Sequence, residues 1–220
     1  MVVPAPPAPP ALELASTGMS SSTFAIPAAL SERPERTRLD VKTHMMNVLE
    51  GHSVLLAGRL LGARGPLGLR GRMIALQALG HRGWRTLART RTSTNGGYRL
   101  RFLAERVGSE TLRLRFAGDA TDAESHRRLG ELKTYRLVEA SWYGGAGSLA
   151  CGGSLTDSTL GVANKTLPCG TLVTLRYNGR SIRVPVVDRG PYVEGREFDL
   201  TLATKEALGF GDTGELWSTA

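Results

Sequence analysis

The chain has 220 residues, of which 41% are hydrophobic and 22% charged, a globular composition with room for one large domain or two small ones. No run of eighteen apolar residues occurs, which excludes a membrane-spanning helix. The net charge of +8 is unevenly placed: residues 1–137 hold 21 basic and 11 acidic side chains, and residues 138–220 hold 7 and 9. This asymmetry indicates two units, of which the basic one either binds an anionic polymer or presents a solvated, arginine-rich face.

The first 37 residues predict a disordered linker. A Pro/Ala tract from Pro4 to Pro10 is followed by a Ser-rich stretch from Ser16 to Thr23, and no hydrophobic period is sustained. A basic segment followed by an apolar one is not visible, so no complete signal peptide is recognised.

Residues 38–137 predict an all-β sandwich. Tyr98–Phe102 and Leu112–Phe116 alternate strictly between apolar and arginine side chains, which is the pattern of a half-buried strand. Asn95-Gly96-Gly97 is a turn signal before the first of these runs. Short apolar runs at spacings near ten residues favour a sandwich, and the others are Leu39–Val41, Val54–Leu60, Met73–Ala78 and Trp84–Thr92. The segment resembles bacterial immunoglobulin-like or carboxypeptidase-regulatory-like repeats, through residues 58–60, 83–84, 94–98 and 115–119.

Residues 138–220 predict a second, mostly β unit with one helix. Asn178-Gly179 is a type I′ hairpin signal between Leu172–Tyr177 and Ser181–Val187. Thr201 is suited to begin a short helix that ends at Leu208 before Gly209.

Cys151 and Cys169 are the only cysteines of the chain. The pair could form a disulfide, half of a zinc site or two free thiols. Zinc needs four ligands, and no histidine or further cysteine lies near them in the sequence, which favours the disulfide. Such a bond would contribute about 3 kcal/mol and would imply an oxidising compartment.

Three motifs stand out in this second unit: Ala140–Gly145 (ASWYGG), Leu160–Thr171 (LGVANKTLPCGT) and Val186–Val193 (VVDRGPYV), the last followed by Phe198–Thr201. In this order and spacing they resemble the RlpA-like domain of septal-ring lytic transglycosylases, which is related to expansins and barwin-like proteins. The resemblance implies a six-stranded double-psi β-barrel. It also implies a secreted protein of the bacterial cell envelope that acts on peptidoglycan, cleaving glycan strands between N-acetylmuramic acid and N-acetylglucosamine.

Asp188 and Asp199 are the expected catalytic residues. If the alternation of Ile182, Val184 and Val186 continues, Asp188 faces the apolar interior. Burial at the rim would then raise the pKa of its carboxyl, as protonation of a glycosidic oxygen requires. The resemblance implies the same role, because Asp188 matches an aspartate implicated in RlpA-like enzymes and Asp199 an essential acid of the expansin-like relatives.

Six further residues are expected to bind the glycan: Tyr192, Tyr143, Arg189, Asn164, Thr156 and Asp157. No cofactor or metal is expected. The expected partners are peptidoglycan strands and, through the basic unit, anionic wall polymers, without nucleic acid.

A second hypothesis is a non-catalytic, expansin-like module that binds and loosens wall polysaccharide. Many RlpA-like enzymes carry a glutamate where this chain has Gly153, and often a histidine where it has Asn164. The two aspartates favour the enzyme, whereas these two differences favour the binding module.

Overall fold

The computed structural model describes residues 1, 33–44, 46–63 and 68–220. Most of the predicted linker, residues 2–32, lies outside the described residues. The end of that predicted segment is ordered, because Glu35 bridges to Asp122 and the first strand begins at Thr37. The described secondary structure therefore begins within the predicted linker, and the domain boundary at residue 38 stays a prediction.

The first part of the chain forms two facing sheets. One sheet has the order β1-β3-β6, with antiparallel pairing throughout, and consists of β1 (Thr37–His44), β3 (Ser53–Gly62) and β6 (Gly97–Leu103). The other has the order β8-β7-β4-β5, with β2 parallel to β8, and consists of β2 (Asn47–Leu49), β4 (Met73–Gly80), β5 (Gly83–Arg91), β7 (Gly108–Phe116) and β8 (Ser125–Tyr143).

The predicted alternation fills the core between these sheets. Leu112 and Leu114 on β7 are fully buried, and Arg113 between them is partly exposed and packs on the Trp84 ring. On β6 the buried residues are Tyr98 and Leu100. An all-β sandwich is therefore confirmed in its layers, and its immunoglobulin-like character stays a prediction.

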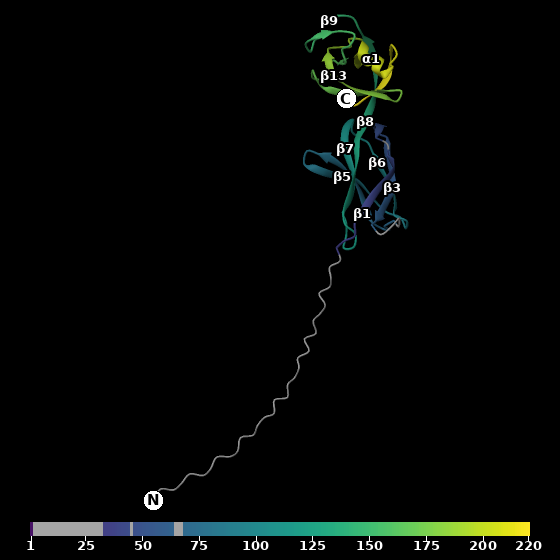
Figure 1. Cartoon of the computed structure of the whole chain (residues 1–220). Helices are drawn as coiled ribbons and strands as arrows, with labels where there is room; N and C mark the ends of the chain where they lie inside the picture. The colour runs from purple at the N-terminus through teal and green to yellow at the C-terminus, as the bar shows by residue number, and fades with distance from the viewer. Residues whose placement is uncertain (2–32, 45, 64–67) are drawn as a thin grey trace. The chain divides into compact units, whose positions relative to one another are not determined.

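Strand β8 is longer than the sequence indicated. It pairs with β7 through Ser125–Thr134, and from Arg136 onward it pairs with β15 and then β14 (Figure 1). The predicted domain boundary at residue 138 therefore falls inside a strand, because period-two patterning does not mark the point where a strand changes partners. Two separate buried clusters nevertheless meet at this point, one ending at Leu132 and the next beginning at Val138. The division into two domains stays a prediction.

The C-terminal part is a closed ring of six strands, as the resemblance implied. The ring runs β8-β15-β12-β13-β11-β14 and returns to β8. Its further members are β11 (Val162–Ala163), β12 (Leu172–Tyr177), β13 (Arg180–Asp188), β14 (Phe198–Thr201) and β15 (Thr213–Ser218). A small hairpin of β9 (Gly147–Ser148) and β10 (Ser154–Leu155) lies outside the ring.

Two local predictions in the ring are confirmed. Asn178 and Gly179 have φ of 44° and 84°, as a type I′ turn between β12 and β13 requires. Helix α1 (Leu202–Leu208) ends at Gly209 in the left-handed region. Thr201 precedes this helix but makes no side-chain cap, because its hydroxyl bonds with the Gly161 backbone and Thr204 instead. In the part of the chain that is described, no helix is long and apolar enough to cross a membrane.

Candidate functional site

The ring places the two aspartates on either side of one residue. Ala163 on β11 pairs with Asp188 on β13 in parallel register and with Asp199 on β14 in antiparallel register. Because neighbouring strands lie about 4.8 Å apart, the two acidic Cα atoms are separated by two strand spacings, roughly 10 Å. Side chains of this length can approach one substrate from both sides.

Asp188 is anchored by backbone amides. Its Oδ1 accepts hydrogen bonds from the Ala150 N–H and the Arg189 N–H, each at 2.8 Å. The carboxyl is partly exposed at the end of β13, after the buried Val184 and Val186. Oδ1 of Asp188 therefore fixes the turn, and the residue lines a groove.

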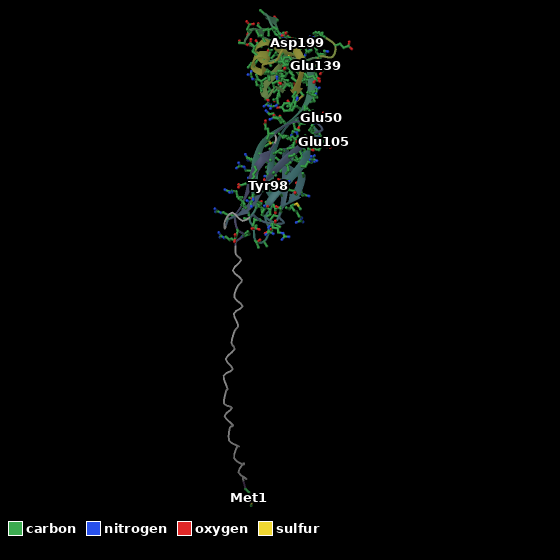
Figure 2. All side chains as sticks on the ribbon, turned by 90° about the vertical axis from the view of Figure 1, so that its right-hand side faces the viewer. Met1, Glu50, Tyr98, Glu105, Glu139 and Asp199 are labelled. Carbon is green, nitrogen blue, oxygen red and sulfur yellow. A yellow bond between two sulfur atoms is a disulfide. The ribbon has the colours of Figure 1, made fainter. Side chains whose placement is uncertain are left out.

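Burial raises the pKa of one of the two aspartates, Asp199. Desolvation raises the pKa of Asp199, and this effect outweighs the hydrogen bond from Ser141 and the charge of Arg196, both of which lower it. Ser141 Oγ donates to Asp199 Oδ1 at 2.7 Å, since the two residues are paired across β8 and β14. From the sequence alone, a raised pKa is expected for Asp188 rather than for Asp199. Figure 2 labels Asp199 among the side chains of the ring.

Tyr143 lies near both Asp188 and Asp199. Its hydroxyl is buried and has no hydrogen-bond partner of ordinary geometry among the described residues. Desolvation raises the pKa of Tyr143, and the nearby Asp188 and Asp199 raise it further. The contact of this hydroxyl with Asp188 falls outside ordinary hydrogen-bond geometry, so the hydroxyl is suited to a hydrogen bond with substrate.

These side chains line a groove of about 170 Å³. Tyr192 forms its outer wall and is 83% exposed, which leaves the ring face free to stack on a sugar. The charged and tyrosine side chains that line the groove are Tyr143, Asp188, Arg189, Tyr192, Arg196 and Asp199.

Arg189 and Asn164 hold the loop that forms one side of the groove. Arg189 Nη1 donates to the carbonyls of Asn164 and Leu167, and its Nη2 lies 3.1 Å from Cys169 Sγ. Asn164 is only 3% exposed, and its side-chain amide bonds to three backbone groups. Arg189 therefore lines the groove while anchoring the loop, whereas Asn164 positions the loop from beneath.

The expected disulfide is present. Cys151 and Cys169 are bonded, with their Cα atoms 5.5 Å apart, and Cys151 N–H donates to the Val187 carbonyl. Because Ala150 holds Asp188, the disulfide ties the loop carrying that amide to the Asn164–Cys169 loop.

Two predicted binding residues lie elsewhere. Thr156 and Asp157 are exposed in the loop after β10, where Thr156 bonds to Ser158 and Thr159, and neither lines the groove. Conversely, the sequence argument missed Ser141 and Arg196. Ser141 lies within the ASWYGG motif, but only strand pairing reveals that it reaches Asp199.

The fold and the groove define this part of the chain as a six-stranded β-barrel with an acidic, tyrosine-lined site at one rim. Residues 136–216 match the family model described as lytic transglycolase. A probable endolytic peptidoglycan transglycosylase RlpA of Aquifex aeolicus is 44% identical over 75 residues, 32% of this chain and 33% of that protein. The endolytic peptidoglycan transglycosylase RlpA of Pseudomonas aeruginosa is 37% identical over 92 residues, 39% of this chain and 27% of that protein.

The barrel therefore belongs to the RlpA-like double-psi β-barrel family. The chain spans about a third or less of the length of these two relatives. Among solved structures, the Streptomyces papain inhibitor is 27% identical with a TM-score of 0.32, covering 38% of this chain and 90% of that one. Among the residues that the structure describes, no group of three His, Cys, Asp or Glu side chains could hold a metal ion.

Proposed function

We propose that the barrel is a lytic transglycosylase that cleaves peptidoglycan glycan strands between N-acetylmuramic acid and N-acetylglucosamine. The observation that carries this proposal is the pair of aspartates flanking Ala163 at the rim of a groove with two tyrosines. The relatives named as peptidoglycan transglycosylases match the same segment of the chain.

Asp199 is the acid in this proposal. Its pKa is raised by burial, so a larger fraction of its carboxyl keeps the proton that the leaving oxygen must receive. Ser141 holds one of its oxygens, which fixes the direction in which the carboxyl presents its proton. As the glycosidic bond breaks, that proton passes from Asp199 to the departing oxygen.

Asp188 is the base. The muramic acid C6 hydroxyl attacks its own anomeric carbon, and its proton passes to Asp188, leaving a 1,6-anhydro ring and no added water. The attack is intramolecular, so proximity supplies much of the rate, and no second nucleophile is needed. Proton return from Asp188 to Asp199 through solvent resets the site. Tyr143, near both carboxyls, donates a hydrogen bond that orients the substrate.

The direct test is incubation of the full chain with peptide-stripped glycan strands, followed by mass analysis for 1,6-anhydro ends. We expect product from the wild type and losses of about a hundredfold or more for Asp188→Asn and Asp199→Asn, because an amide can neither donate nor accept the proton. Glu206→Gln, an exposed change on α1, is the matched control and should cleave normally. Wild-type rates in both aspartate variants would contradict the assignment.

A non-catalytic, wall-loosening module is the second candidate. It is favoured by Gly153, which has no side chain, and by the burial of Asn164, whose amide is used by the backbone. If the wild type yields no anhydro ends but binds insoluble wall, and Asp199→Asn weakens that binding, this candidate replaces the enzyme.

The proposed location is the bacterial cell envelope, reached by secretion. The disulfide supports an oxidising compartment. Peptidoglycan is the proposed substrate, and the basic N-terminal half is proposed to contact anionic wall polymers, with no role in binding nucleic acid.

A further inference from the structure

The sandwich carries a cationic groove that spans strands β1, β3 and β6 of one sheet and the end of β5 of the other. The groove has a volume of about 610 Å³ and is lined by Lys42 of β1, Arg59 of β3, Arg91 of β5 and Arg99 of β6. No aspartate or glutamate is among its described lining residues.

Strand register brings these cations together. Ala57 pairs with Arg99 and Arg59 with Gly97 across β3 and β6, so the two arginines occupy neighbouring positions on one face. Gly58 and Tyr98 between them are buried, which places Arg59 and Arg99 on the solvent side by the period-two rule. Lys42 lies in a β-bulge of β1 opposite the same part of β3.

The floor of the groove is rigid. Tyr98, labelled in Figure 2, is 3% exposed and donates from its hydroxyl to the Asp40 carbonyl at 2.8 Å. A Cβ at Gly58 would overlap both that carbonyl and the Tyr98 hydroxyl, so glycine is required there. The groove therefore exists before any ligand arrives.

None of the four cationic side chains that line the groove forms an ion pair with an acidic residue in the described part of the chain. Arg59 donates from Nε and Nη2 to the Asn95 carbonyl at 3.1 and 2.8 Å, and Arg91 donates to the Gly71 carbonyl at 3.0 Å. Lys42 and Arg99 have no carboxylate partner among the described residues. Asp40, which is paired with Arg59 in the sheet, has its carboxylate 3.1 Å from Arg38. Four positive charges thus converge on one groove, and carbonyls rather than acids orient two of them.

We propose that this groove binds a linear phosphate polymer that lacks bases. Arginine side chains bind phosphate with paired N–H donors, and a row of them favours a chain with repeated charges. Single-stranded nucleic acids are held through bases stacked on aromatic rings, and Tyr98, the only aromatic residue among the described lining residues, is buried. This inference rests on the proposed contact with anionic wall polymers, and it is independent of cleavage by the barrel.

The test is a titration of the full chain with fluorescently labelled inorganic polyphosphate at two salt concentrations. We expect the double variant Lys42→Glu/Arg99→Glu to bind at least about tenfold more weakly than wild type. Arg82→Glu/Arg106→Glu changes the net charge equally at two exposed positions outside the groove and should lose less than about threefold. Melting curves verify that both variants fold.

Three outcomes would overturn the proposal: no binding by the wild type, equal losses in the two double variants, or much tighter binding of oligothymidylate with the same number of charges. Cleavage of stripped glycan strands is measured in the same samples, and the groove variant should retain it. If the wild type does not cleave the strands but binds polyphosphate in the groove, the transglycosylase proposal is refuted and the polymer-binding proposal is retained.

Discussion

Removal of the Cys151–Cys169 disulfide should destabilise the barrel by about 3 kcal/mol. The bond closes a loop with a sequence separation of 18 residues, and loop-closure entropy for that length gives this magnitude. If the barrel unfolds by itself, Tm should fall by roughly 12–24 °C in Cys151→Ser/Cys169→Ser, and by about half as much if the sandwich unfolds with it. Cleavage should fall as well, since Ala150, next to Cys151, donates to the Asp188 carboxylate.

The measurement is urea unfolding of the full chain, followed by tryptophan fluorescence, for wild type with and without reductant and for the double serine variant. Reduced wild type and the variant should coincide, because both lack only the crosslink. Val193→Ala, an exposed change on the groove wall, controls for substitution near the site and should leave the unfolding midpoint unchanged. A double variant as stable as oxidised wild type would refute the loop-closure reasoning.

Four other outcomes are expected. Cleavage should decrease as pH rises through the pKa of Asp199, which lies above the usual 3.8. Ser141→Ala should move this decrease to higher pH, because the substitution removes a hydrogen bond that lowers the pKa of Asp199. A pH profile of anhydro product that Ser141→Ala leaves unchanged would contradict this. Since the raised pKa favours the folded state at low pH and disfavours it as pH rises through that pKa, Asp199→Asn should melt no lower than wild type at pH 7. Tyr143→Phe should raise KM with only a small change in Tm, because the hydroxyl approaches Asp188 without a hydrogen bond of ordinary geometry among the described residues; an unchanged KM would remove Tyr143 from substrate binding. A fragment of residues 136–220, which keeps the Arg136–Glu197 ion pair, should fold alone with a cooperative melt, and a fragment that stays unfolded would show that the two halves are one domain.

Local sequence patterns predicted those parts of the fold that depend on residues close together in the chain. The Asn178-Gly179 turn and the helix end at Gly209 follow from the few residues that adopt positive φ without strain. Alternation in Leu112–Phe116 predicted which side chains are buried, because a strand has only two faces. The family resemblance of the three motifs in the second half implied the barrel, and the closed ring of strands confirms it.

Pairing between strands that are far apart in the sequence determined which residues meet at the candidate site. Nothing local in the sequence places Ala163 between Asp188 and Asp199, or brings Ser141 to Asp199, since these contacts join strands far apart in the chain. Thr201 shows the same limit: its type predicted a helix cap, but a buried backbone at Gly161 competes for its hydroxyl. The sequence by itself determined that two acids and two tyrosines belong to one motif-rich barrel. Only the tertiary structure decided which acid is buried enough for its pKa to rise, because desolvation depends on every element packed around a group.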